Sequence, residues 1–337
     1  MPHIGSLLRT VTKQNTIRLF KHVMFAAAGI LVTPSAQTAW CQTTRTIKVV
    51  VPYPPGGGVD ALARILADQI GRTRGPAIVI ENRPGAGTVI ATEAVARAAP
   101  DGKTVLVADS NLLIMPHVRK LNYDPRTSFE PICQLVNSPQ VLVVNSASPY
   151  HTLPDLLNAA RAKPGDLTLA SVGPASLPRI AFEQLKRAAN VDITFVTYPG
   201  AAAAANALLG GHVTSVLISY AAVGEQIKAG KLRALAVATP VRIEPLPDLP
   251  TIAESGYVGY EADLWDGVIV PAKTPSETVA EITGWLTSAV QDPETKRKLV
   301  AQGLFPAVTC GTDFGALIRK QYDEYGRVIR EANIRAD

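Results

Sequence analysis

The chain has 337 residues, of which 47% are hydrophobic and 18% are charged, so its composition excludes a largely disordered protein. At roughly 100–200 residues per domain, this length predicts two domains with a sizeable core. The formal net charge is +5, but Arg9, Lys13, Arg18 and Lys21 lie in a leader stretch without any acid. The rest is nearly balanced and has no basic run interleaved with aromatics, so no nucleic-acid partner is predicted.

The N-terminus has the pattern of an export signal. A basic stretch precedes the apolar run 23–32, and Pro34 with small residues follows up to Ala39. The run is too short to span about 30 Å of hydrocarbon, which favours a cleaved signal peptide at 1–39 over a membrane anchor. Cys41 would suit a lipoprotein, but the preceding Trp40 spoils that pattern. We therefore expect a free protein in the periplasm.

After the leader, apolar strand-like runs alternate with segments of helical period, which is typical of βαβ units around mostly parallel sheets. In the first block we predict strands at 47–51, 77–80, 104–108 and 140–145, and helices at 59–70 and 92–99. A Pro-containing stretch at 124–131 precedes the run 140–145, and no strand is predicted there.

A second block repeats the alternation. We predict strands at 167–170, 193–196, 213–219 and 232–238, and helices at 153–162, 178–189, 201–209 and 223–229. Three prolines make 244–250 an extended connector. A strand at 265–270 and helices at 276–290, 293–302 and 312–332 follow, and we expect them to return to the first sheet. The predicted lobes are 45–146 plus 266–337 and 147–265, with a ligand cleft between them.

Two glycine loops that each join a strand to a helix are the main candidates for binding. Gly56, Gly57 and Gly58 follow Tyr53 and Pro54 and precede Asp60. Glycines let a ligand approach the backbone, and a helix start favours an anion; the alternative is a plain tight turn capped by Asp60. The spacing matches no nucleotide-binding motif. In the second loop, Gly87 and Thr88 end the run 81–88, whose Glu81 and Arg83 are expected to form a structural charge pair.

The second block offers corresponding strand-to-helix loops. Small residues there can present backbone N–H groups and hydroxyls to a ligand oxygen, although ordinary loop chemistry explains each one alone. The candidates are Ser171, Gly173, Ala175, Ser176, Tyr198, Gly200, Ala201 and Ser219. Trp265 fits either the pocket wall or the core.

Catalytic and metal sites are not predicted. There is no G-x-S-x-G elbow, and His117, His151 and His212 lack metal-ligand spacing with other residues. Cys41, Cys133 and Cys310 are widely spaced, so a zinc site is not indicated, while one disulfide and isolated thiols both remain open.

Several motifs together resemble one family. The run Val51-Pro-Tyr-Pro-Pro-Gly-Gly-Gly-Val-Asp60 with Ala63-Arg64, then Glu81-Asn-Arg-Pro-Gly-Ala-Gly87 and Leu246-Pro-Asp-Leu-Pro-Thr251, is similar to Bug-type receptors, the extracytoplasmic subunits of tripartite tricarboxylate transporters. The resemblance implies a two-lobed α/β fold like that of periplasmic binding proteins. It also implies a monomer that binds a small mono- or dicarboxylate without a cofactor and delivers it to membrane transporter subunits or a sensor. Carried over by motif, the site includes the glycine loops, Ser110 and the second-block loops.

The second block departs from the family pattern. Gly173 to Arg179 lacks the usual polar stretch, Ala201 replaces a polar residue, and Ser219 replaces a frequent acid. These changes lead us to expect a ligand without an ammonium group, because its charge would be poorly paired. The competing function is an exported α/β enzyme acting on a small carboxylate in the same cleft. A further option, the effector-binding half of a regulator, is disfavoured by the signal peptide.

Overall fold

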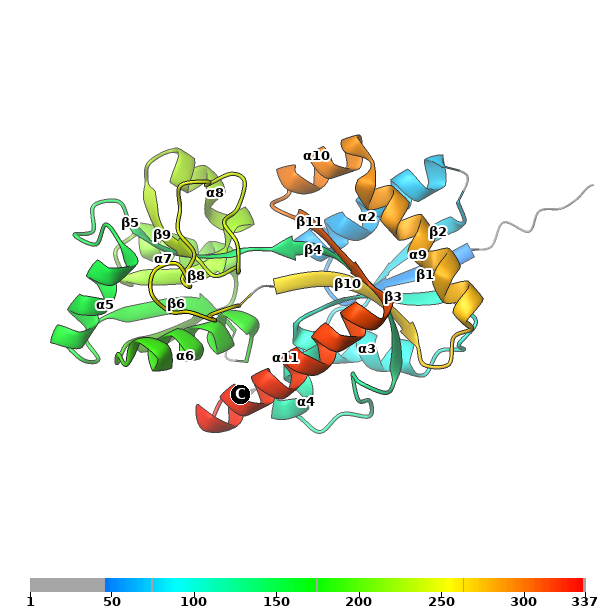
Figure 1. Cartoon of the computed structure of the whole chain (residues 1–337), viewed down its shortest axis with the longest axis horizontal. Coiled ribbons are helices and arrows are strands. Elements are labelled where there is room, and N and C mark those ends of the chain that lie inside the picture. Colours follow the sequence, from blue (N-terminus) through cyan, green and yellow to red (C-terminus); the bar gives the residue numbers. More distant parts are fainter. Residues whose placement is uncertain (1–45, 74, 174, 263, 336–337) are drawn as a thin grey trace, which may run out of the picture. The chain divides into compact units, whose positions relative to one another are not determined.

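The computed structural model describes residues 46–73, 75–173, 175–262 and 264–335, so the predicted signal peptide and Cys41 lie outside the described residues. Two β-sheets organise this part of the chain (Figure 1). The first sheet has the order β11-β4-β10-β3-β1-β2. Its strands are β1 (Thr46–Val51), β2 (Ala77–Asn82), β3 (Thr104–Asp109), β4 (Phe129–Ser138), β10 (Leu264–Pro271) and β11 (Phe305–Cys310).

Helices cover both faces of the first sheet. One apolar cluster joins it to α2 (Gly58–Arg72), α9 (Ser276–Gln291) and α10 (Pro293–Ala301). A second cluster joins it to α3 (Val89–Ala96), α4 (Asn111–Val118) and α11 (Gly311–Glu331). The C-terminal helices therefore return to the first sheet, as the sequence predicts. No helix within the described ranges has the length and apolar character needed to cross a membrane.

The second sheet has the order β7-β6-β8-β5-β9. Its strands are β5 (Gln140–Asn145), β6 (Thr168–Val172), β7 (Thr194–Tyr198), β8 (Ser215–Ser219) and β9 (Leu232–Val237). The helices α5 (Leu153–Ala162) and α6 (Leu177–Ala189) pack on one face, and α7 (Ala201–Leu209) and α8 (Tyr220–Lys228) pack on the other. Both sheets belong to one compact unit of the chain.

The predicted boundary between the lobes is wrong at one strand. The segment 140–145 pairs with β8 and β9, so it belongs to the second sheet, and the crossing lies next to Pro139. An apolar run fits the centre of either sheet, and sequence alone does not say which. The sequence also missed β4 and β11. Proline is disfavoured inside a sheet, but at Pro131 the strand β4 pairs only with β10, because β11 pairs with β4 only from Cys133 onward, and such an edge position tolerates proline.

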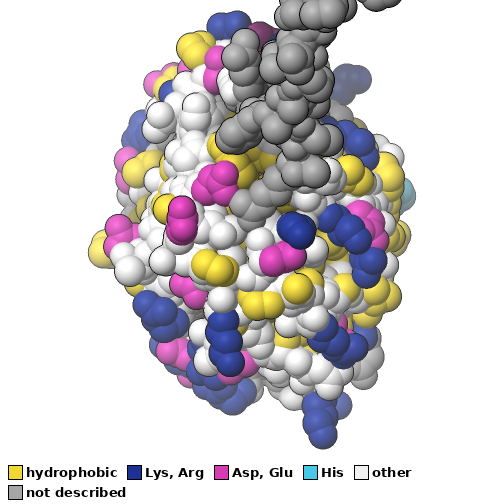
Figure 2. All heavy atoms as spheres, turned by 90° about the vertical axis from the view of Figure 1, so that its right-hand side faces the viewer, with side chains coloured by type: hydrophobic (Ala, Val, Ile, Leu, Met, Phe, Trp, Pro, Cys, Tyr) yellow, Lys and Arg dark blue, Asp and Glu magenta, His cyan; other side chains and the backbone are white. Residues whose placement is uncertain are grey.

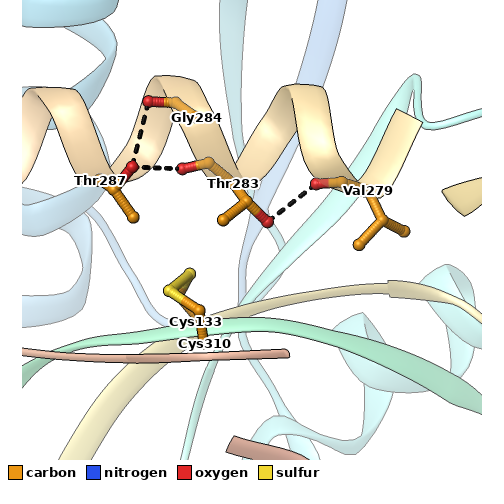
Figure 3. The surroundings of a disulfide bond; sticks show 6 residues. All are labelled: Cys133, Val279, Thr283, Gly284, Thr287 and Cys310. Atoms are coloured by element: carbon orange, nitrogen blue, oxygen red, sulfur yellow. Dashed lines mark hydrogen bonds between the residues drawn. A yellow bond between two sulfur atoms is a disulfide. The ribbon is translucent and has the colours of Figure 1, made fainter. Parts of the chain in front are cut away.

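A disulfide joins β4 and β11, two neighbouring strands of the first sheet. Cys133 and Cys310 lie directly opposite each other in the β4 and β11 pair and form a bond. Figure 3 shows the two sulfur atoms between these strands and helix α9, beneath the turn that carries Thr283. Of the two outcomes left open by the sequence, the structure has the disulfide.

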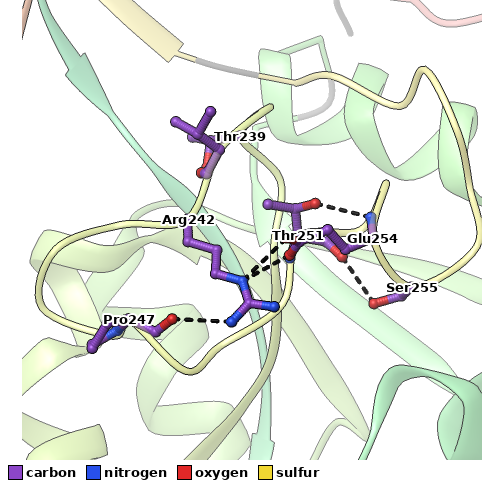
Figure 4. Close-up of polar contacts among 7 residues, drawn as sticks. Thr239, Arg242, Pro247, Thr251, Glu254 and Ser255 are labelled. Atoms are coloured by element: carbon purple, nitrogen blue, oxygen red, sulfur yellow. Dashed lines mark hydrogen bonds and ion pairs between the residues drawn. The ribbon is translucent and has the colours of Figure 1, made fainter.

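The proline-rich connector between β9 and β10 is held by side chains. Arg242 pairs with Glu254 at 2.9 Å and donates to the Pro247 carbonyl at 3.2 Å (Figure 4). Thr251 and Glu254 exchange backbone-to-side-chain hydrogen bonds at 2.8 and 3.0 Å. The connector at 244–250 therefore has a defined path without being a strand.

Charges of both signs are mixed on the surface. On the face in Figure 2, Lys and Arg side chains lie among acidic and apolar ones and do not gather in one patch. This face offers no basic stripe for a nucleic acid.

Candidate functional site

A cleft of about 800 Å³ is lined by loops and strand ends of both sheets. Parallel strands end at one edge of a sheet, which gathers their following loops there. Nine of the predicted site residues line this cleft: Tyr53, Pro54, Gly56, Gly57, Gly58, Ser171, Ser176, Ala201 and Ser219. The volume is of the size that small-molecule sites occupy.

The other predicted residues do not line the cleft. They are Asp60, Gly87, Thr88, Ser110, Gly173, Ala175, Tyr198, Gly200 and Trp265. Trp265 belongs to the core: it is 1% exposed, packs edge-on against Phe314, and donates to Gln321 Oε1 at 2.7 Å. Neighbouring strand residues point to opposite faces, so Trp265 points away from the cleft that Asp266 lines.

Asp60 shapes the first glycine loop and does not touch the cleft. Its carboxylate accepts from the backbone N–H of Gly56 at 2.8 Å, from Arg64 Nε at 2.8 Å and from Asn82 Nδ2 at 2.9 Å. The hydrogen bond from Arg64, followed by those from Gly56 and Asn82, lowers the pKa of Asp60 to about 2 despite the opposing effect of burial. The loop thus turns at Gly56, whose φ is +93°, and delivers Gly57 and Gly58 to the helix start.

The start of α2 offers backbone N–H groups to a ligand. Its N-cap is Gly57, and no side chain caps it. Both Gly57 and Gly58 line the cleft, so the amides and the positive end of the helix dipole face that space. This is a suitable place for an anion.

The second glycine loop does not line the cleft and packs against α4 instead. A Cβ on Gly87 would lie 2.6 Å from Met115 Sδ, and its φ is +65°, so glycine is required there for packing against α4. Thr88 and Ser110 are 4% and 1% exposed, and within the described part of the chain their hydroxyls have no hydrogen-bond partner. Both glycine loops were candidates for binding, but only the first one lines the cleft. Arg83 pairs with Glu81, as predicted.

The wall from the second sheet includes helix starts and serine hydroxyls, beside Gln140 of β5 and several apolar side chains. Ser176 caps α6 by accepting from the Arg179 N–H at 3.4 Å. In contrast, α7 follows Gly200 and α8 follows Ser219, and neither start has a side-chain cap. The Ser219 hydroxyl lies 3.0 Å from that of Ser138.

The sequence missed a polar group at the first sheet. The Tyr53 hydroxyl donates to Asp109 Oδ2, and Asn111 donates from its backbone to Asp109 Oδ1 at 2.9 Å and from Nδ2 to the Tyr53 hydroxyl at 2.8 Å. Asp266 of β10 also lines the cleft. Burial raises the pKa of Asp109; burial and Asp109 raise that of Tyr53 well above its usual value. The sequence signal for this polar group was Asp109, an acid directly after the apolar run 104–108.

Metal binding finds no support in the described ranges, where no group of three or more His, Cys, Asp or Glu side chains is placed to hold an ion. The polar atoms of the cleft come from hydroxyls, amides and two carboxylates. Such a set suits binding of a small polar molecule through hydrogen bonds.

Comparisons with known proteins identify the fold and the family. Residues 62–334 match the model of the tripartite tricarboxylate transporter family receptor. The protein BugT of Bordetella pertussis is 31% identical over 315 residues, which cover 92% of this chain and 95% of BugT. Among solved structures, the periplasmic binding protein BugD has 31% identity and a TM-score of 0.71, covering 86% of this chain and 98% of that one. Rpa4515 of R. palustris, solved with adipate, has 31% identity and a TM-score of 0.73, covering 87% and 99%.

These findings confirm the predicted fold class and the predicted resemblance. The matched family is one of receptors for transport, as the sequence predicts, and the comparisons give the alternative of an enzyme no support. The chain belongs to the tripartite tricarboxylate transporter receptor family, and within it resembles the Bug proteins.

Proposed function

We propose that this protein is a periplasmic receptor that binds a small carboxylate in the cleft between its two sheets. The observation that carries the proposal is the start of α2, which has no side-chain cap and whose Gly57 and Gly58 line the cleft. The uncapped starts of α7 and α8 lie at the other wall. Each helix start contributes about 0.3–1 kcal/mol toward an anion when exposed and more when partly buried.

The relatives support the same ligand class. One structure similar to this chain holds adipate, a carboxylate, and another is described as a periplasmic binding protein. The export signal expected at 1–39 fits that compartment. We therefore extend the proposal to a ligand-loaded receptor that hands its cargo to the membrane subunits of a transporter or to a sensor, and that acts as a monomer.

The test begins with the ligand that the protein carries from the cell. Protein purified without denaturation is analysed by mass spectrometry for a released small acid, and ligand-free protein is then titrated calorimetrically with that acid and with succinate, glutarate and adipate. We expect saturable binding of at least one carboxylate, with one molecule per chain. Failure of every one of these acids to bind would contradict the proposal.

Export is tested separately. N-terminal sequencing of material from the periplasm is expected to show cleavage near Ala39, and an intact Met1 in that fraction would contradict the predicted signal peptide.

A further inference from the structure

The turn 302–305 joins α10 to β11 and contributes two residues to the cleft. Gln302 and Leu304 both line it, and Leu304 is 2% exposed. A Cβ on Gly58 would lie 3.8 Å from Leu304 Cδ2, so the turn packs beside the start of α2. This is the helix start that the proposed function assigns to the carboxylate.

The same turn packs against the second half of the chain. Phe305 contacts the apolar cluster of the second sheet, and its ring centroid is 6.3 Å from that of Tyr220. A Cβ on Gly303 would lie 2.5 Å from Ala221 Cβ and 2.8 Å from Ala221 Cα, which is too close for a side chain. Tyr220 and Ala221 begin α8 directly after Ser219, a residue of the second wall. The turn therefore bridges the two walls of the cleft.

The turn itself is fixed to the first sheet. At the end of α10 the backbone N–H of Leu304 donates to the Leu299 carbonyl at 3.0 Å, and Phe305 pairs with Asn137 of β4. Gly303 has φ +71°, the left-handed conformation that suits glycine at a helix end. The helix end explains why this residue is glycine, but it does not require the close contact with α8.

We propose that the turn 302–305 is a latch that retains the ligand, because its contact with the start of α8 keeps the two walls together. The inference rests on the proposed carboxylate receptor and adds to it the residues that control ligand release. Gly303 is a positioning residue, since it does not line the cleft and acts through α8. A contact that must open before the ligand leaves lowers the dissociation rate more than the association rate.

The variant Gly303→Ala tests the latch. Its Cβ would collide with backbone atoms of Ala221, so α8 has to move away from the turn. The ligand is whichever of succinate, glutarate and adipate binds the wild type most tightly. Displacement of the radiolabelled acid by unlabelled acid, followed by rapid filtration, gives the dissociation rate, and calorimetric titration gives Kd. We expect the dissociation rate to rise by at least about tenfold and the association rate to change by less than about threefold.

Gly230→Ala is the matched control for strain at a helix end. Gly230 follows α8 in the same way, with φ +68°, and the next residue, Lys231, donates its N–H to the Gln226 carbonyl at 2.9 Å. A Cβ there meets no atom within 4 Å. This variant carries the same backbone strain without the collision, so both rates should stay at the wild-type values.

Phe305→Leu loosens the latch without adding bulk. It removes the ring that faces Tyr220 and keeps an apolar side chain in β11. We expect the dissociation rate to rise by about threefold. If Gly303→Ala does not fold, Phe305→Leu decides.

The outcomes separate the two proposals. An unchanged dissociation rate in Gly303→Ala, an equal rise in Gly230→Ala, or a loss of affinity that comes mainly from slower association overturns the latch and leaves the carboxylate receptor intact. Where Phe305→Leu decides, a wild-type dissociation rate overturns the latch in the same way. Absence of binding of all three acids to the wild type contradicts the proposed function, and the latch falls with it.

Discussion

The wall of the cleft from the first sheet carries two buried carboxylates and a tyrosine hydroxyl, whereas the wall from the second sheet carries no charged side chain and is formed by serine hydroxyls, the Gln140 amide and apolar side chains. The first wall is also fixed: Asp60 holds the glycine loop, and Asn111 and Tyr53 hold Asp109. In the second wall, Ser171 donates its hydroxyl to the Leu217 carbonyl and so supports a strand end. We therefore expect the first wall to contribute more to ligand selectivity than the second, which offers mainly helix starts.

The largest effect on the free energy of unfolding is expected from the disulfide, which lies in the first sheet. Replacing both Cys133 and Cys310 with alanine should lower the free energy of unfolding by about 2–5 kcal/mol, because the bond closes a long loop around the second sheet. Urea denaturation measures the loss, and reduced wild-type protein should show a similar one. A double variant as stable as the oxidised protein would contradict this role.

Adding a side chain to each wall tests which wall touches the ligand more closely. A Cβ on Gly57 meets no protein atom within 4 Å, and the backbone there, at φ −81°, accepts valine, so Gly57→Val should fold normally. We expect it to weaken the ligand about a hundredfold, or about 2.7 kcal/mol, by blocking approach to the α2 amides.

The matched change on the second wall is Ala201→Val, at the start of α7. We expect a loss of about tenfold or less, since this position already carries a Cβ. Calorimetric titration of both variants with the same ligand gives the comparison, and equal losses would show that the walls do not differ in this respect.

Asp60→Asn tests how firmly the first wall is held. Loss of its charged hydrogen bonds should cost about 1–3 kcal/mol of stability at neutral pH. The pKa of Asp60 is lowered in the fold, so its contribution is complete above the ordinary value of 3.8 and disappears as the pH falls toward about 2. Chemical denaturation across this range should show the wild type and the variant converging, and a gap that stays constant would argue against the Asp60 network.

The smallest effect is expected in the second half, at the connector. Arg242→Ala removes an exposed ion pair with Glu254 and a hydrogen bond to Pro247, which should cost less than about 1 kcal/mol. Hydrogen exchange should nevertheless increase locally at 244–256. A large global loss of stability would show that the connector contributes as much as the first-sheet anchors.

Much of the fold was predictable because it depends on local pattern. Apolar runs with helical segments between them predicted the strands β1 to β3 and β5 to β10 and most helices, and the triple glycine after β1 predicted one wall of the cleft. The limits have physical reasons. The strand β4 contains Pro131, a residue that is disfavoured inside a sheet, and was not predicted. The strand β5 was predicted, but no local signal assigns it to the second sheet.

The sequence by itself determined the family, the α/β class and the helix start at Gly57 and Gly58, because each depends on neighbouring residues. Only the tertiary structure decided that Asp109 meets Asp266 and that Cys133 meets Cys310, since strand pairing brings together residues far apart in the chain. The tertiary structure also decided that Trp265 lies in the core and that its neighbour Asp266 lines the cleft. The pleat of a strand sends adjacent side chains to opposite faces, and only the packing of the sheet determines which face meets the ligand.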